Sequence, residues 1–507
     1  MSASKRILSG TIASWVQIAV AMSAQILLVP LYLSFWDAAT YGLWLAVLSF
    51  SSLLSAFDLG FQEYMNYEFL KLGGQLPKKM SKLLSSGMMV AIILGLIQIA
   101  VVLLIYWLDV LPMIFKDLGS SLKGKAIQAF YVLFIQSIVW LLCNTAGGLL
   151  NRIMATYGYY PRMAWWSVVT NTMLLVSPAI AVVFGADLLT AGVVMGAAKV
   201  AFDIPVWFDM LRLLKKHKVR VVKPSVELGW TSFCKSTNLS ATGFLENVRQ
   251  QGARLIMSPI IGATGVAVFS TIRTGSNVAL QGLRTIINPL MPELMTFLHK
   301  RDQERTEVAF STLWVVTIAV IAPCLLVVQT FMPIIYHAWT RGKLSFDPWL
   351  FALLSFSVLI YALSQPGIAV VKGNNLLKPQ LIISIMSAII AVLGIFILVP
   401  VYGIKGAGMA LLLSEIAASI AFTKIAGKWL EGVGLKWPQR GFKIALSSVA
   451  ITSLGLVTMI ISPKYELLTL CVSLALLGYN FYRYWLTLPQ LAVVKAKAIL
   501  SGFGSKN

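Results

Sequence analysis

Residues 233–286 read FCKSTNLSATGFLENVRQQGARLIMSPIIGATGVAVFSTIRTGSNVALQGLRTI. The stretch contains two apolar runs, and each is long enough for the roughly 20 helical residues that cross a bilayer core of about 30 Å. A segment of small residues, 262–265, separates the two runs. The pattern predicts two successive membrane-spanning helices.

Four ionisable residues lie away from the ends of these two predicted spans, where hydrocarbon is expected: Glu246, Arg249, Arg254 and Arg273. A charge at bilayer depth costs about 2.5–3.5 kcal/mol on insertion scales, so such residues usually face protein or water and serve a substrate path. Three of the four are cationic. The pattern therefore predicts a site for an anionic substrate.

The rest of the chain has the same membrane character. Of its 507 residues, 58% are hydrophobic and 12% are charged, and the mean hydropathy is +0.81. Soluble proteins are far more polar. We predict an all-α polytopic membrane protein with about 14 transmembrane helices. The spans are expected near 11–34, 41–62, 84–108, 126–150, 162–184, 188–211, 233–259, 264–286, 308–335, 349–371, 379–400, 404–425, 442–462 and 466–486.

An even number of spans places both termini on one side of the membrane, and positive residues favour the cytoplasmic side. With cytoplasmic termini, only seven of the 41 Lys and Arg residues fall in outside segments: Lys116, Lys123, Lys125, Arg341, Lys343, Lys405 and Lys464. Both ends are therefore expected in the cytoplasm. The first apolar run exceeds the roughly 7–15 residues of a signal-peptide core, so it is expected to remain as a span.

The densest basic segment, residues 212–223, follows the sixth predicted span. Its cations are explained either as determinants of topology or as ligands for anionic lipid headgroups at the inner leaflet. The two roles are compatible, and the segment is expected to be a cytoplasmic linker.

Other classes of function find little support in the sequence. Cys143, Cys234, Cys324 and Cys471 are widely separated, with no Cys-x-x-Cys motif, so neither a disulfide framework nor a zinc site is indicated. No Ser/His/Asp order, glycine-rich phosphate loop or paired-carboxylate motif is present. We therefore expect no enzymatic activity, no catalytic residue, no metal and no cofactor. The net charge of +22 follows membrane topology, so no nucleic-acid partner is expected.

The chain contains two similar six-span units. Val29-Pro30 is echoed by Ser258-Pro259, and each unit begins in the cytoplasm, as expected of parallel repeats with a substrate site between two bundles. The expected domains are an N-terminal six-helix bundle (1–211), the basic linker (212–231), a C-terminal six-helix bundle (232–430), and two extra helices with a cytoplasmic tail (431–507). A parallel pseudo-twofold axis is expected to relate the bundles.

Three segments carry a resemblance to a known family: Asp58-Leu59-Gly60, residues 288–293 (NPLMPE), and residues 399–408 (VPVYGIKGAG) with a Pro-x-x-Gly-x-x-Gly-Ala run. The chain resembles Wzx-type flippases of O-antigen and other polysaccharides, in the polysaccharide transporter family. That family belongs to the wider group of MATE exporters and MurJ-like flippases. The resemblance covers roughly residues 1–430.

The resemblance implies a V-shaped pair of bundles that opens alternately inward and outward. The implied substrate is a polyprenyl-pyrophosphate-linked oligosaccharide repeat unit, moved from the inner to the outer leaflet of the bacterial cytoplasmic (inner) membrane for surface polysaccharide biosynthesis. Implied partners are membrane lipids, a polysaccharide polymerase and the chain-length machinery. Many such flippases have twelve spans, whereas MurJ-like proteins have the fourteen expected here.

The predicted substrate-binding residues are Arg249, Arg254, Arg273 and Lys199, because a cation attracts phosphate and a guanidinium engages its oxygens in bidentate fashion. At 100° per residue, Arg249 and Arg254 share one broad helix face with Glu246. Repeat symmetry predicts that this face meets the first bundle across a cleft, opposite Lys199 and Asp203.

Three carboxylates are candidates for coupling to a proton or sodium gradient: Glu246, Asp203 and Glu415. Burial raises the pKa of a carboxyl, whereas a neighbouring cation lowers it. Lys199 and Asp203 are helix neighbours, as are Glu246 and Arg249. Each pair is explained either as a mutual neutralisation or as part of a site.

Three alternative functions remain open at this point. They are a MurJ-like flippase for the peptidoglycan precursor, a MATE-like multidrug exporter, and a membrane-embedded glycosyltransferase, polymerase or ligase. An exporter of cationic drugs would favour carboxylates over arginines, and the enzymes would be expected to carry a large periplasmic loop. Several tryptophans near span ends are predicted to be interfacial anchors: Trp165, Trp166, Trp207, Trp339 and Trp349.

Overall fold

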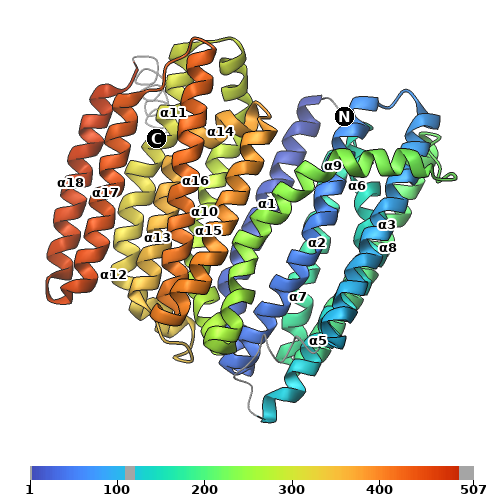
Figure 1. The fold of residues 1–507 in the computed structure, drawn as a ribbon, viewed down its shortest axis with the longest axis horizontal. Helices are drawn as coiled ribbons and strands as arrows, with labels where there is room; N and C mark the ends of the chain where they lie inside the picture. Colours follow the sequence, from blue (N-terminus) through green and yellow to red (C-terminus); the bar gives the residue numbers. More distant parts are fainter. Residues whose placement is uncertain (1–2, 109–119, 490–507) are drawn as a thin grey trace, which may run out of the picture. The chain divides into compact units, whose positions relative to one another are not determined.

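The computed structural model describes residues 3–108 and 120–489, which form helices and connecting segments without a strand (Figure 1). Within them, eleven helices are long and apolar enough to cross a membrane, and one bent pair raises the number to twelve. The prediction of an all-α polytopic membrane protein is confirmed.

The helices follow the predicted spans closely. They are α1 (Ala3–Phe35), α2 (Ala38–Leu72), α3 (Pro77–Trp107), α5 (Ser120–Val139), α6 (Ala146–Thr156), α7 (Tyr160–Val183), α8 (Leu188–Lys216), α9 (Val226–Asn247), α10 (Ala253–His299), α11 (Gln303–Val316), α12 (Ala322–Trp339), α13 (Pro348–Leu363), α14 (Gln365–Gly373), α15 (Leu377–Tyr402), α16 (Ile404–Gly432), α17 (Gln439–Ile461) and α18 (Glu466–Thr487).

Two features reconcile the twelve candidates with the fourteen predicted spans. The candidate Val226–Leu283 is divided at Gly262, whose φ of 70° and ψ of 175° break the helix in a backbone conformation that glycine adopts without strain. In addition, α18 is a membrane-length helix of 22 residues outside that set. When Val226–Leu283 is counted as two spans and α18 is added, the described residues contain fourteen membrane-length helical segments, hereafter called rods.

Three of the rods contain a turn of π-helix. These turns are η1 (Trp140–Thr145) between α5 and α6, η2 (Val248–Gly252) between α9 and α10, and η3 (Thr317–Ile321) between α11 and α12. Such turns often occur at functional sites. Two of them, η1 and η2, carry residues of the candidate site.

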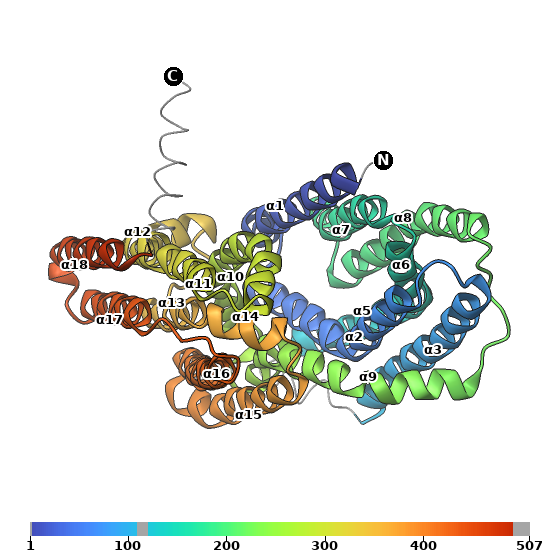
Figure 2. The same ribbon diagram turned by 90° about the horizontal axis from the view of Figure 1, so that it is seen from above.

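The first of two compact units contains Met1–Thr271 and Thr340–Leu344. Within it, α1 packs on α7, α7 and α5 pack on α8, and α9 lies against α2 and α3 (Figure 2). A buried cluster rich in Met and Phe joins α2, α3, α6 and α8, and includes Phe61, Met65, Phe69, Met80, Leu149, Ile153 and Met210. In lipid such contacts stabilise through van der Waals packing.

Small residues set the contact between α2 and α9. A Cβ on Gly60 would overlap the backbone of Ser240, so the two helices approach at a glycine. This is the usual device of close helix packing in membranes.

The second unit contains Ile272–Trp339 and Ser345–Asn507. Within it, α15 packs on α16, and α17 lies against α18, α12 and α13. Polar contacts fix the last two helices: Tyr484 Oη donates to the Ser311 carbonyl at 3.1 Å, and Asn480 Nδ2 donates to Ser447 and Ser448 Oγ at 2.8 and 3.1 Å. The two extra helices are therefore integrated into this unit.

The compact units divide the chain between Thr271 and Ile272, so α9 belongs to the first unit. The sequence placed residues 232–271 in the second bundle, because the repeat begins there. The predicted domain boundaries and the pseudo-twofold relation between bundles stay predictions.

The basic linker is attached to the N-terminal turns of α3 by serine side chains. The backbone N–H groups of Arg220, Val222 and Ser225 donate to the hydroxyl oxygens of Ser81, Ser85 and Ser86, at 3.1, 2.9 and 2.9 Å. These bonds hold the segment extended along α3 and leave its cations exposed.

An aspartate caps the start of α8. Asp187 Oδ1 accepts the Thr190 N–H at 2.9 Å, and Oδ2 accepts from Gln128 Nε2 at 2.8 Å. The hydrogen bonds from Thr190, followed by that from Gln128, lower the pKa of Asp187 below 3.8.

Candidate functional site

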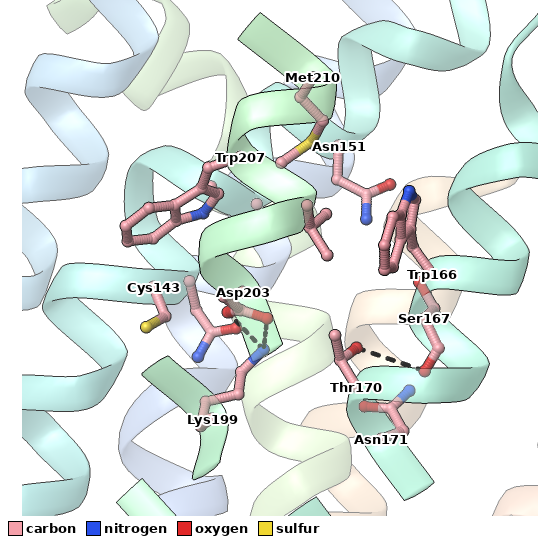
Figure 3. Close-up of a pocket in the computed structure, with 14 residues that line it drawn as sticks. Cys143, Asn151, Trp166, Ser167, Thr170, Asn171, Lys199, Asp203, Trp207 and Met210 are labelled. Carbon is pink, nitrogen blue, oxygen red and sulfur yellow. Dashed lines mark hydrogen bonds and ion pairs between the residues drawn. The ribbon is translucent and has the colours of Figure 1, made fainter. Parts of the chain in front are cut away.

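A pocket of about 150 Å³ opens inside the first unit, among η1, α6, α7 and α8 (Figure 3). Half of its lining residues have polar or charged side chains, which is unusual among membrane helices. The lining residues are Cys143, Asn144, Gly147, Gly148, Asn151, Trp166, Ser167, Thr170, Asn171, Lys199, Asp203, Val206, Trp207 and Met210.

An ion pair lies on the pocket wall. Lys199 Nζ is 2.7 Å from Asp203 Oδ2 and 2.9 Å from Oδ1, and the two side chains are only 13% and 8% exposed. The predicted contact between these helix neighbours is therefore present. The pair is close to neutral as a unit, yet both residues line the pocket.

Two tryptophans flank the pocket from opposite sides in Figure 3. Trp166 is held from behind, because its Nε1 donates to Asp209 Oδ2 at 3.0 Å, and Arg162 donates to both oxygens of the same carboxylate. Trp207 reaches the pocket beside Gly147, where a Cβ would meet the indole Nε1 at 2.7 Å. The sequence predicted interfacial anchors at both positions, whereas the structure places both on the pocket wall.

Three side-chain amides of the pocket have unused hydrogen-bonding capacity. Those of Asn144, Asn151 and Asn171 make no hydrogen bond to any other residue that the structure describes. Each amide offers donors and an acceptor. The pocket therefore presents neutral donors and acceptors beside two aromatic rings and a paired charge.

A buried carboxylate lies next to this pocket. Asp58 on α2 is 3% exposed, and its Oδ2 accepts from Trp140 Nε1 at 2.9 Å and from Gln62 Nε2 at 3.0 Å. Gln62 Nε2 also donates to the carbonyl of Asn144 at 2.9 Å. The other oxygen, Asp58 Oδ1, is buried without a hydrogen-bond partner among the described residues.

Asp58 is the functional candidate that sequence reasoning passed over, since it entered only as part of a family motif. The available signal was an acidic residue within an apolar span, the same signal that selected Glu246. What the sequence could not show was its contact with η1, which is 82 positions away along the chain.

A second polar cluster lies on the seventh predicted span, 233–259, hereafter span seven, which consists of α9, η2 and the start of α10. Arg249 binds Glu246 in bidentate fashion, with Nη2 to Oε1 at 2.7 Å and Nε to Oε2 at 3.2 Å. Gln250 Nε2 also donates to Oε1 at 3.1 Å. Both Arg249 and Gln250 belong to η2. The predicted pairing of Glu246 with Arg249 is therefore observed.

Arg254 differs from its neighbours because its contacts are neutral. Its Nη1 donates to Ser49 Oγ on α2 at 3.0 Å and to Gln251 Oε1 at 3.1 Å. No carboxylate of the described residues lies within 4 Å of it, and its Nε is buried without a partner among them. The expectation of a cleft between this face and the first bundle is wrong for Arg254, because its side chain contacts Ser49 directly where η2 and α9 pack on α2.

The two remaining predicted residues lie in the second unit. Arg273 on α10 is 8% exposed and Glu415 on α16 is 7% exposed, so both are buried. The described residues contain no group of three or more His, Cys, Asp or Glu that could hold a metal ion.

Comparison with known proteins relates the chain to solved structures only. No family model matches it, and no curated protein matches it. A structure of the lipid II flippase MurJ in an inward closed conformation matches with a TM-score of 0.61 and 15% identity, covering 94% of this chain and 99% of that chain.

Two further structures are similar over a smaller part of the chain. An inward-facing MATE multidrug resistance transporter of the MOP superfamily matches with a TM-score of 0.64 and 14% identity, covering 83% of this chain and 98% of that chain. A MOP superfamily transporter from Pyrococcus furiosus matches with a TM-score of 0.57 and 14% identity, covering 85% and 96%. At these identities the likeness shows the fold: the chain has the fold that MurJ and MATE transporters of the MOP superfamily share.

Proposed function

We propose that this protein is a flippase that moves a polyprenyl-pyrophosphate-linked oligosaccharide from the inner to the outer leaflet of the bacterial cytoplasmic membrane by alternating access. In this proposal both termini are cytoplasmic, and the product feeds surface polysaccharide assembly by a polymerase and its chain-length machinery.

The observation that carries the proposal is the charge of Arg254. Among the described residues, the hydrogen-bond partners of this guanidinium are the neutral side chains of Ser49 and Gln251, which leave most of its positive charge uncompensated. A pyrophosphate supplies the missing negative charge, and the planar donor fork suits its oxygens. A cationic drug would be repelled, which disfavours a MATE-like exporter.

The extent of the fold points in the same direction. The MurJ structure covers 94% of this chain, whereas the MATE transporter and the Pyrococcus furiosus MOP superfamily transporter cover 83% and 85%. The difference is about a tenth of the chain, which is close in size to the segment that carries α17 and α18. This length supports a lipid-linked substrate over a small soluble one.

The Glu246–Arg249 pair suggests how substrate binding could be coupled to an ion gradient. A phosphate that engages Arg249 competes with Glu246 for the same donors. Displacement would change the charge around the Glu246 carboxylate, whose side chain is 45% exposed. Such a change could link headgroup binding to an ion gradient. Asp203 and Glu415 stay further candidates for this role.

A second candidate is a flippase for the peptidoglycan precursor, because the likeness to MurJ includes 99% of that chain. The two functions share the polyprenyl-pyrophosphate and differ in the attached sugars. Depleting the chain in cells and identifying which lipid-linked saccharide accumulates on the cytoplasmic leaflet separates them.

The test uses proteoliposomes that contain this protein alone and a fluorescent polyprenyl-pyrophosphate-linked saccharide, with translocation followed by lectin accessibility of the sugar. Arg254→Gln is expected to slow translocation by about tenfold or more, since it removes a charge-assisted bond. Arg254→Lys should retain part of the rate.

The matched control is Arg483→Gln, which removes an exposed arginine from α18. Its translocation rate should equal that of the wild type. An Arg254→Gln protein that translocates at the wild-type rate, in the same amount per vesicle, would remove this residue from the mechanism.

A further inference from the structure

We infer that the pocket among η1, α6, α7 and α8, hereafter the α8 pocket, holds a single sugar ring of the transported headgroup. The inference rests on the proposed function and adds to it a carbohydrate subsite separate from the arginines of span seven. Its basis is the size, charge and aromatic walls of the pocket (Figure 3).

The size admits one ring. At about 10–15 Å³ of such space for each water, a volume of about 150 Å³ holds on the order of ten water molecules. A space of that size accommodates a single pyranose. Because Trp166, Asn171 and Lys199 are only partly buried, the ring can stay linked to the rest of the headgroup outside.

The charge of the pocket selects against ions. Lys199 is neutralised by Asp203 at 2.7 Å, so a phosphate gains little from the lysine and a drug cation gains little from the aspartate. Among the described residues that line the pocket, Asp203 is the one carboxylate and Lys199 the one cation. A neutral ligand with many hydroxyl groups does not depend on an unpaired charge in the pocket, so the pairing of Lys199 with Asp203 does not weaken its binding.

The remaining groups match the two kinds of surface on a pyranose. Its hydroxyls both donate and accept, as do the amides of Asn144, Asn151 and Asn171, which have no partner among the described residues. Its C–H faces are apolar and lie against aromatic rings, a surface that Trp166 and Trp207 supply.

The walls are also fixed in advance. Trp166 Nε1 donates a hydrogen bond to Asp209, and Arg162 donates two more to the same carboxylate, from Nη2 at 2.6 Å and from Nε at 2.7 Å. Two glycines leave room for neighbouring side chains: a Cβ at Gly147 would contact Trp207, and a Cβ at Gly148 would contact Gln62. A site that is ordered before binding loses less entropy when the ligand arrives.

The test compares two probes on purified full-length protein: farnesyl pyrophosphate, and farnesyl pyrophosphate that carries one pyranose. The sugars are glucose, galactose and their N-acetylamino forms, and affinities are measured by thermophoresis. At least one glycosylated probe is expected to bind the wild type more tightly than the bare pyrophosphate.

Asn151→Ala/Asn171→Ala should weaken the preferred glycosylated probe by about 30-fold, the effect of two lost hydrogen bonds, and leave the bare probe unchanged. Trp166→Leu should also lower the sugar preference, and Trp166→Phe should restore it in part because it keeps an aromatic face. The matched control is Trp165→Leu, which alters the adjacent indole outside the pocket lining.

The inference is overturned if every glycosylated probe binds the wild type no better than the bare probe, or if the pocket variants weaken both probes equally. Failure of the proposed function has a different signature. In that case neither probe binds, or Arg254→Gln leaves the affinity for both probes unchanged.

Discussion

The Lys199–Asp203 pair allows the structural and the substrate-binding roles of a buried charge pair to be measured separately. The perturbations are Lys199→Met, Asp203→Leu and the double substitution. Each single change leaves one charge in a site where the side chains are at most 13% exposed. The double change removes both charges and fills the same space with apolar atoms.

The expected magnitudes follow from the burial of the pair. Removing one partner of a buried pair costs about 3–5 kcal/mol, whereas replacing both by apolar residues is often neutral. Polar groups of the pocket still reach the remaining charge, so we expect the lower end, about 3 kcal/mol. At about 2 °C per kcal/mol, the melting temperature should fall by about 6 °C in each single variant. The double variant should return to near the wild-type value.

The assay combines thermal unfolding in detergent with translocation in proteoliposomes. If the pair lines a sugar site, the double variant regains stability but still transports the glycosylated substrate slowly, because hydrogen-bonding groups of the pocket are missing. Recovery of transport together with stability would show that the pair serves only to hold α8 together. Two single variants that are as stable as the wild type would refute the treatment of Lys199 and Asp203 as a buried pair.

Three further predictions address the fold around the site. Gly60→Ala should lower the melting temperature because its Cβ overlaps the backbone of α9, whereas Gly243→Ala on α9 meets nothing within 4 Å and should be neutral or slightly stabilising; equal melting temperatures would contradict the close contact of α2 with α9. Ser85→Ala/Ser86→Ala should release the basic linker from α3, so trypsin should cut there faster than in the wild type while cleavage elsewhere keeps its rate; an unchanged cleavage pattern would argue against this attachment. The pKa of Asp187 is lower in the folded than in the unfolded protein, so its cap stabilises α8 at neutral pH and this stabilisation is lost as the pH falls below about 3.8. Asp187→Asn keeps a cap, so the melting temperature of this variant should depend less on pH between 5 and 3 than that of the wild type. Parallel curves of melting temperature against pH would show that this carboxylate is not involved.

Much of the architecture could be predicted because membrane helices leave a direct record in the sequence. Apart from α10, which continues 13 residues past its predicted end, each helix starts and ends within about ten residues of the predicted span, since the bilayer fixes the minimum length of every apolar run. The sequence placed the break between the seventh and eighth spans in the segment 262–265. The structure confirms it, because the positive φ of Gly262 interrupts the helix there. The pairs Glu246–Arg249 and Lys199–Asp203 also followed from helix spacing alone, because residues three or four apart share a face.

The α8 pocket could not be predicted in the same way, because its residues come from separate helices. Trp166 and Trp207 are 41 positions apart, and their nearness to span ends suggested interfacial anchors. Only packing shows that both line one pocket with Asn144 and Asn151. The π-helical turns left no recognisable pattern either, yet Trp140, which donates to Asp58, belongs to η1.

The α8 pocket and the Glu246–Arg249–Arg254 cluster, both in the first unit, differ in how far their charges are compensated, and this difference bears on mechanism. In the α8 pocket Lys199 is compensated by Asp203, so little charge is left for a ligand to recognise. Near η2, the described partners of Arg254 are neutral, and Arg249 binds a carboxylate that an anion can displace. A headgroup with a neutral ring and a charged pyrophosphate presents the same two kinds of surface. If each cluster recognises one of them, loss of Arg254 should weaken binding of every pyrophosphate lipid, whereas loss of the pocket amides should change only which sugar is preferred. Affinity and specificity would then be carried by different helices, and a change of substrate sugar during evolution would require substitutions in α6, α7 and α8 while leaving span seven intact.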